Sequence, residues 1–178
     1  MKFCSHCGAP VELGIPPGDN LPRHICTHCA TVHYQNPRMV VGCIPEWEGR
    51  ILLCRRAIEP RHGLWTLPAG FMENGETVAD AAARETREEA CAEVEIGQLF
   101  ALVNVPHIHQ VHLFYTARLR DGRFGAGSES LESRLFAEDE IPWPEMAFRS
   151  VRFALSAWLD DRRQGSFGLH TADLSPLD

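Results

Sequence analysis

Residues 63–92 read GLWTLPAGFMENGETVADAAARETREEACA, a segment that combines signals for a strand, a loop and a helix. Its beginning, Leu64–Leu67, is a short apolar run that predicts a strand, and the Pro and Gly that follow predict a loop. Its end, Thr77–Ala90, predicts a helix capped by its first threonine. Small side chains recur at helical spacing and predict a face that approaches a sheet closely: Ala79, Ala83, Thr86 and Ala90.

Three glutamates of this helix, Glu85, Glu88 and Glu89, stand at positions i, i+3 and i+4 and therefore share one face. Carboxylates packed this closely repel one another and destabilise a helix unless a cation neutralises them. Hard oxygen ligands on a rigid element suit Mg2+ or Mn2+. The alternative is a solvated acidic helix face, which glutamates at this spacing often form. The strand and loop that lead straight into the helix favour the metal site, because a backbone carbonyl of that loop can complete the coordination.

Outside this stretch, short apolar runs alternate with one further amphipathic segment. The runs at 39–44, 51–56, 94–102, 108–119 and 133–137 predict strands, and Ser150–Arg163 predicts a second helix. Residues 121–130 are rich in Gly and Ser and predict a loop. Strands interrupted by two helices indicate an α+β domain in which a mixed sheet lies between helices.

Two C-x2-C pairs lie near the N-terminus, one formed by Cys4 and Cys7 and the other by Cys26 and Cys29. Four thiolates complete a tetrahedral Zn2+ site and leave no open position, so this spacing predicts a structural zinc ribbon over residues 1–34. The segment between the pairs has too few apolar residues to build a core, which favours a metal staple. A redox dithiol is the alternative. Residues 35–178 form the second predicted domain.

Composition restricts the partners. The 178 residues carry a formal net charge of −7, and an acidic balance does not attract nucleic-acid phosphates, so a nucleic-acid partner is not expected. An anionic substrate still binds where metal ions neutralise the contact. No apolar run is long enough to span a membrane, the first residues show no secretory signal, and an odd number of cysteines argues against a disulfide framework. We therefore expect a cytoplasmic protein.

The segment from Gly70 to Glu89 resembles the Nudix box, G-x5-E-x7-R-E-U-x-E-E-x-G-U, in which U is an aliphatic residue. Every charged position of the box is matched at its spacing. The departures are Thr86 and Ala92 at U positions and Cys91 in place of the last Gly. A cysteine enters the left-handed conformation less easily than glycine, so we expect the end of the helix to differ in shape. The resemblance implies an α/β/α sandwich preceded by the zinc ribbon.

The resemblance also implies a role for each matching residue. The three box glutamates would bind the catalytic Mg2+ or Mn2+, helped by the carbonyl of Ala69. Glu76 and Arg84 would form a salt bridge that holds the loop, with Gly70, against the helix. That role is structural rather than catalytic.

Residues outside the box have to select the substrate. Glu129 and Glu132, at the end of the Gly-rich loop, are candidates for the carboxylate that takes a proton from water, unless a box glutamate does so. Trp65 and Phe71 are candidates for stacking on an adenine or flavin ring, with core positions as the alternative. Arg55 is a further candidate substrate contact.

Two other groups of side chains stand outside the box. Tyr115 is a third candidate for stacking. His107, His109 and His112 form a cluster at which a solvated strand face is favoured over a cleft.

A four-cysteine ribbon joined to a Nudix domain resembles two subgroups. NADH pyrophosphatases carry an S-Q-P-W-P-F-P-x-S segment after the box, and residues 103–108, VNVPHI, do not match it. A shorter group, similar to ADP-ribose and FAD pyrophosphatases, looks closer across residues 34–37, 65–76 and 129–136. By this resemblance, water attacks one phosphorus of a P–O–P bridge in ADP-ribose or FAD and releases AMP and the partner's phosphate. The alternatives are an NADH pyrophosphatase, an RNA-cap hydrolase and a non-catalytic nucleotide sensor. A homodimer is expected from the resemblance alone.

Overall fold

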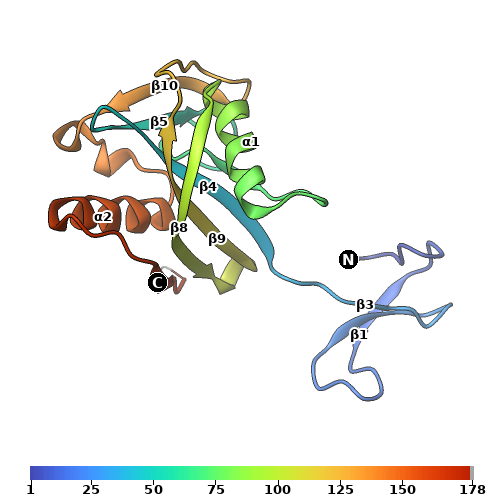
Figure 1. Cartoon of the computed structure of the whole chain (residues 1–178). Coiled ribbons are helices and arrows are strands. Elements are labelled where there is room, and N and C mark those ends of the chain that lie inside the picture. The colour runs from blue at the N-terminus through green and yellow to red at the C-terminus, as the bar shows by residue number, and fades with distance from the viewer. Residues whose placement is uncertain (177–178) are drawn as a thin grey trace. The chain divides into compact units, whose positions relative to one another are not determined.

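The computed structural model describes residues 1–176, and the chain divides into two compact units, residues 1–37 and the residues from Arg38 onward. The division falls three residues after the one expected from the sequence. The first unit is a three-stranded antiparallel sheet in the order β1-β2-β3 (Figure 1). Its strands are β1 (Val11–Gly14), β2 (Arg23–Cys26) and β3 (Val32–His33).

The second unit is built on one mixed sheet with the strand order β10-β5-β4-β9-β8-β11. Two short strands lie off this path: β6 pairs with β5, and β7 pairs with β4. The β4–β9 and β8–β11 pairs are parallel, and the other pairs are antiparallel. The strands are β4 (Arg38–Trp47), β5 (Arg50–Arg56), β6 (Trp65–Thr66), β7 (Ala69–Phe71), β8 (Val94–Val105), β9 (Gln110–Leu119), β10 (Ser130–Phe136) and β11 (His170–Asp173).

Two helices, α1 (Val78–Ala90) and α2 (Arg149–Gln164), cover this sheet (Figure 1). Three 3-10 turns, η1 (Pro106–Ile108), η2 (Glu138–Glu140) and η3 (Trp143–Glu145), lie in the connections. The expected mixed sheet with two helices is therefore confirmed. Among the described residues, no helix is sufficiently long and apolar to cross a bilayer.

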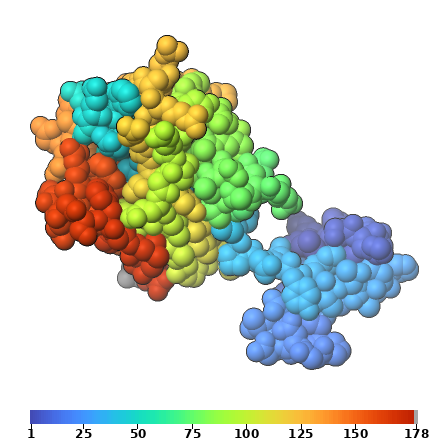
Figure 2. Space-filling view, in the orientation of Figure 1, coloured from blue at the N-terminus to red at the C-terminus, as the bar shows by residue number. Residues whose placement is uncertain are grey.

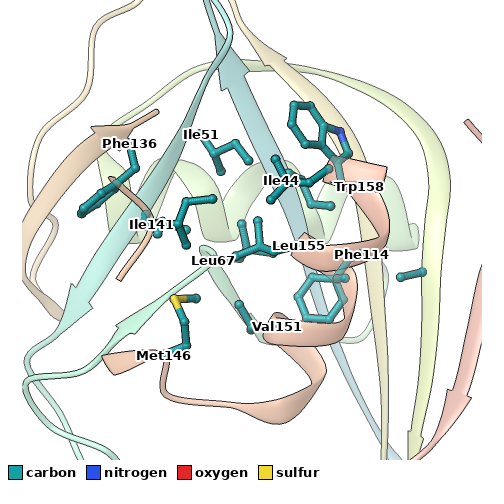
Figure 3. Packing of buried hydrophobic residues seen from close by; sticks show 14 of the residues in the cluster. Ile44, Ile51, Leu67, Phe114, Phe136, Ile141, Met146, Val151, Leu155 and Trp158 are labelled. Carbon is teal, nitrogen blue, oxygen red and sulfur yellow. The ribbon is translucent and has the colours of Figure 1, made fainter. Parts of the chain in front are cut away.

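The larger part of the core lies between the sheet and α2. Figure 3 shows its side chains from β4, β5, β9 and α2 meeting at the centre of this layer, among them Ile44, Ile51, Phe114, Val151, Leu155 and Trp158. Burial of these side chains follows the apolar face of α2 that the sequence predicts.

Helix α1 packs on the sheet through its small residues. Ala81, Ala82, Thr86 and Ala90 are fully buried, whereas Ala79 and Ala83, which the spacing had placed on the same face, are only half-buried. The helix is rotated relative to the expected face, and this rotation also turns Glu85 and Glu89 inward. Small side chains let the helix backbone approach the sheet, and the glutamates are thereby brought close to the strands.

Candidate active site

The N-terminus of α1 is fixed by the threonine that the sequence predicts as its cap. The hydroxyl of Thr77 accepts a hydrogen bond from the backbone N–H of Asp80 at 3.1 Å, and it donates to the Asp80 carboxylate at 2.6 Å. A cap of this kind stabilises a helix by about 1 kcal/mol. The register of the helix, and with it the direction of the three glutamates, is therefore set at this end.

The glutamates of α1 differ in burial. Glu85 is 8% exposed and Glu89 is 7% exposed, while Glu88 lies at the surface. Burial raises the pKa of the Glu89 carboxyl to about 7, and it also raises the pKa of Glu85. Two acids that lose solvation in the same place are held at a cost unless a cation compensates them.

Arg84 connects the helix to the loop before it. Its guanidinium donates to both carboxylate oxygens of Glu76, at 2.5 and 3.1 Å, and to the backbone carbonyl of Phe71 at 3.1 Å. It also donates to Glu85 at 2.8 Å and to Glu88 at 2.9 Å. The Arg84 guanidinium lowers the pKa of Glu76. The pair expected from the sequence is formed, and one arginine orients two of the three helix glutamates as well.

Strand β7 brings the backbone up to the glutamates. The N–H of Ala69 donates to the Glu89 carboxylate at 3.0 Å. A Cβ atom on Gly70 would lie 2.4 Å from a carboxylate oxygen of Glu85, so any other residue here would displace that carboxylate from its present position. The glycine therefore lets the Glu85 carboxylate lie directly against β7.

These groups line one side of a cleft of about 570 Å³. Its lining includes Ala69, Gly70, Phe71, Arg84 and all three helix glutamates, together with Arg56, Glu129 and an apolar portion formed by Val40, Ile108, Phe114, Phe148 and Val151. Among the described residues that line the cleft, Arg56 and Arg84 are the arginines. Arg84 already bonds three carboxylates, so Arg56 is the cation with donors left for a ligand.

The loop before β10 docks on the C-terminal end of α1. The N–H groups of Gly125 and Gly127 donate to the carbonyls of Ala90 and Glu89, at 2.8 and 3.0 Å, and satisfy acceptors that the helix end leaves unpaired. A Cβ atom on Gly127 would lie 1.7 Å from the carbonyl oxygen of Glu88. Figure 2 shows this segment, in gold, beside the green helix. The docked glycines bring Glu129 to the cleft.

Cys91 closes the helix in the left-handed conformation, at φ 48° and ψ 33°, and its N–H donates to the carbonyl of Arg87 at 3.0 Å. The prediction that this end of α1 differs in shape from one closed by glycine is therefore wrong. The cysteine takes the conformation that glycine favours, at a cost of roughly 1 kcal/mol. The two glycine N–H groups of the docked loop compensate, because they bind the last carbonyls of the helix.

Several side chains singled out in the sequence lie elsewhere. Trp65 is 7% exposed and packs edge-on against Phe136 in the core, with ring centroids 4.8 Å apart, because β6 pairs with β5 beneath the surface. Arg55 donates to the carbonyl of Gly63 at 2.9 Å and does not line the cleft. Glu132 is exposed on β10, outside the cleft, and Tyr115 packs in the core on the α1 side. None of these four residues, candidate base or candidate substrate contact, lines the cleft.

Two polar residues on β9 and one on α2 were not predicted to face a cleft. His112 is 8% exposed rather than part of a solvated face, and burial lowers its pKa to about 4. It lies with Gln110 and Ser150 in the lining. The alternation of Gln110 and His112 indicates that both side chains lie on the same face of the strand. It does not indicate that α2, which is distant in sequence, covers that face. His107 and His109 are exposed around the η1 turn.

In the first unit, the four cysteines come together. Their ligand atoms all lie within 4.8 Å of one another, as a metal site requires. Cys4 and Cys26 are buried, and the N–H groups of His28 and Cys29 both point to the Cys26 sulfur at 3.4 Å. His33 lies 3.3 Å from the Cys4 sulfur through its Nε2, a neighbour that the sequence did not single out.

Comparison with known proteins agrees with this geometry. Residues 36–159 match the NUDIX domain family, and residues 2–35 match the zinc-ribbon family described as Nudix N-terminal. The chain belongs to the Nudix hydrolase family. The match covers the cleft, α1 and most of α2, and the expected resemblance is confirmed.

Curated relatives of this Nudix chain carry two kinds of name. It is 30% identical over 113 residues to an ADP-ribose pyrophosphatase of Methanocaldococcus jannaschii, covering 61% of this chain and 67% of that protein. It is 32% identical over 160 residues to the NAD-capped RNA hydrolase NudC of Chromobacterium violaceum, covering 86% of this chain. The chain spans 58% of that relative's length.

Among solved structures, a NUDIX hydrolase from Nitrosomonas europaea is 55% identical with a TM-score of 0.92, covering 98% of this chain and all of that one. An ADP-ribose pyrophosphatase from Streptococcus suis is 25% identical with a TM-score of 0.62, covering 76% of this chain and 99% of that one.

Proposed function

We propose that this Nudix chain hydrolyses the diphosphate bond of a nucleoside diphosphate linked to another group, with ADP-ribose or FAD as substrate, and releases AMP and the partner's phosphate. The observation that carries the proposal is the cluster of three carboxylates, two of them buried, that faces a cleft large enough for a nucleotide. A binding protein without catalysis has no need for such a cluster, because three glutamates in one place repel one another.

The donor set fits a hard divalent cation. Glu85, Glu88 and Glu89, with the carbonyl of Ala69, would hold Mg2+ or Mn2+, which prefer oxygen ligands. When bound, the metal would neutralise the diphosphate and lower the pKa of coordinated water. The burial that raises the pKa values of Glu85 and Glu89 supports this assignment, because a cation would relieve the cost of their charges.

The remaining residues of the cleft divide the other tasks. In the reaction a water oxygen bonds to one phosphorus, the bridging P–O bond breaks, and the proton of the water passes to a carboxylate. Glu129 is the base that we favour, because it lines the cleft close to the helix glutamates. Burial is the main cause of the raised pKa values of Glu85 and Glu89, and the charge of Glu129 adds to it. Its position is anchored through its carbonyl, which accepts from the N–H of Ala57 at 2.8 Å.

Two further side chains are proposed to hold the substrate. Arg56 uses its Nε to donate to the carbonyl of Pro60, which leaves the terminal nitrogens of its guanidinium for phosphate oxygens. Phe71 is 46% exposed at the cleft, and its ring offers a face on which a base can stack. Arg84 donates to Glu76 and to the carbonyl of Phe71, and so keeps the end of β7 against α1.

A second candidate function is hydrolysis of NAD-capped RNA, which the similarity to NudC favours. The chemistry at the diphosphate is the same, so the two candidates differ in what is attached to it. The formal net charge of −7 argues against a long nucleic-acid contact. For the first unit, we propose that the four cysteines hold one structural Zn2+.

The test is a hydrolysis panel of ADP-ribose, FAD, NADH, a nucleoside triphosphate and NAD-capped RNA, with the products identified. We expect ADP-ribose or FAD to give the highest kcat/KM. A kcat/KM more than about tenfold higher for NADH, the triphosphate or the capped RNA, a gap of roughly 1.4 kcal/mol in transition-state binding, would reject the assigned substrate and keep the hydrolase.

A further inference from the structure

The part of the cleft away from the carboxylates contains a polar group in apolar surroundings. Gln110, His112 and Phe114 alternate along β9 and therefore share one face of the sheet. Val40 of β4 is the register partner of His112, and Val151 and Phe148 approach from the start of α2. A polar side chain in this apolar part of the cleft can fix the orientation of a base, because few other polar groups are present to bind it.

A chain of hydrogen bonds fixes Gln110. The hydroxyl of Ser150, which is 2% exposed, lies 2.8 Å from Nδ1 of His112, and Nε2 of His112 lies 2.9 Å from Oε1 of Gln110. Burial holds this imidazole neutral by lowering its pKa to about 4, so one nitrogen donates and the other accepts. Because Oε1 of Gln110 can only accept, this arrangement places the proton on Nε2 of His112, and Nδ1 then accepts from the Ser150 hydroxyl.

The carboxamide of Gln110 is therefore oriented before a ligand arrives. Its oxygen keeps a second lone pair, and its NH2 group has no hydrogen-bond partner among the described residues. An amide held in this way offers one acceptor beside two donors. Fixing the side chain in advance also reduces the entropy lost on binding.

The separation between Gln110 and the carboxylates suits a nucleotide. Strand β4 gives the scale: Gln110 is the register partner of its residue Arg38. Ala69, whose N–H donates to Glu89, is the register partner of Gly42, four residues further along β4. At the rise of a strand this is about 13 Å, a span that a nucleoside monophosphate bridges with its phosphate at the carboxylates. Phe71 and Ile108, each 46% exposed, lie at the cleft and offer apolar surface to the base.

From this arrangement we propose that Gln110 is a specificity-determining residue that selects a 6-aminopurine, adenine, over a 6-oxopurine, with His112 as its positioning residue. The inference rests on the proposed nucleotide hydrolase. Adenine presents an N–H donor beside a ring nitrogen acceptor, and a carboxamide complements both. Hypoxanthine has an oxygen in place of the amino group, and that oxygen would face Oε1 of Gln110 without a proton between them.

The experiment compares kcat/KM for ADP-ribose and inosine diphosphate ribose, which differ only at purine positions 1 and 6. We expect the wild type to prefer ADP-ribose by at least about tenfold, as one bidentate base contact allows. In Gln110→Met, which keeps the length and removes the polar atoms, the ratio should fall below about threefold. His112→Phe should lower the ratio through KM, with kcat little changed. Gln98→Met, at an exposed position of β8, is the control and should retain the wild-type ratio.

The ratio of the two kcat/KM values does not depend on the fraction of folded protein, because both substrates are measured with the same sample. Dissociation constants of AMP and IMP, measured by calorimetry, test the same preference without turnover. If ADP-ribose is not hydrolysed but AMP still binds at least about tenfold more tightly than IMP, the proposed reaction fails and the role of Gln110 stands. A wild-type ratio near one in both measurements, or an unchanged ratio in Gln110→Met, would overturn the assignment of Gln110.

Discussion

Glu89 is the residue on which the proposed chemistry depends most, because it is buried, contacts the backbone of Ala69 and stands between the helix and the cleft. We expect Glu89→Gln to lose on the order of 10³-fold in kcat, since a neutral amide cannot hold the cation as a carboxylate does. The fold should be retained, because the amide has nearly the same shape and relieves repulsion. Glu95→Gln, at an exposed position of β8, is the matched control. Near-wild-type turnover of Glu89→Gln at saturating Mg2+ would refute the role of Glu89.

His112 makes stability depend on pH. Its folded pKa of about 4 lies below the ordinary value of 6.5, so the unfolded chain binds the extra proton between these values. The stabilisation is complete above pH 6.5 and is lost as the pH falls toward 4. The stability advantage of wild type over His112→Gln should therefore shrink by about 2 kcal/mol between pH 8 and pH 5. Chemical denaturation at the two pH values measures this, and an advantage that is equal at both would contradict the buried neutral histidine.

At the level of residues, the sequence predicted what repeats at a fixed spacing. The glutamates and Arg84 of α1 share one short segment, so their spacing alone brings them together. Gln110, His112 and Ser150 meet only because α2 covers β9, and no local pattern carries that information. Trp65 was wrongly expected at the substrate because it stands beside the Nudix box in sequence. It is a core residue, because β6 runs under the surface.

The docked loop is the element that connects α1 to the proposed base. We expect Gly127→Ala to destabilise the protein by about 1–3 kcal/mol, because its Cβ would collide with the carbonyl of Glu88. The loop must then move away from the helix end, so kcat should fall as Glu129 leaves the cleft. Thermal unfolding and turnover measure the two effects. Gly168→Ala, where a Cβ meets nothing, is the control. Unchanged Tm and kcat in Gly127→Ala would show that the docking does not position Glu129.

Among elements, the long strands and both helices could be predicted within a few residues because their periodicity is strong. Strand β7 was missed because it has three residues and lies inside a Pro- and Gly-containing loop. Strand β11 was missed because its backbone pairs with β8, far away in sequence, and is held by contacts such as Asp161 with His170 at 2.8 Å. Both are defined by their partners rather than by their own residues.

At the scale of the whole molecule, the two units have different sources of stability. The second unit has a large apolar core, whereas the described part of the first unit leaves Phe3, Leu13, Ile15 and Leu21 more than half exposed. We expect one tightly bound zinc per chain, and we expect Cys26→Ser to lose it and to unfold residues 1–37 while α1 keeps its hydrogen-exchange protection. Elemental analysis and hydrogen exchange report these outcomes. Wild-type protein purified without chelator that contains no zinc would contradict the site.

At this scale, we propose that the carboxylate cleft cleaves a diphosphate bridge with the help of a divalent metal. The most direct measurement is incubation of the purified protein with ADP-ribose and Mg2+, followed by quantification of every phosphorus-containing product. We predict AMP and ribose 5-phosphate in equal amounts, and no products when a chelator removes the metal. Cleavage that continues without a divalent metal, or products that retain the intact diphosphate bridge, would contradict the claim.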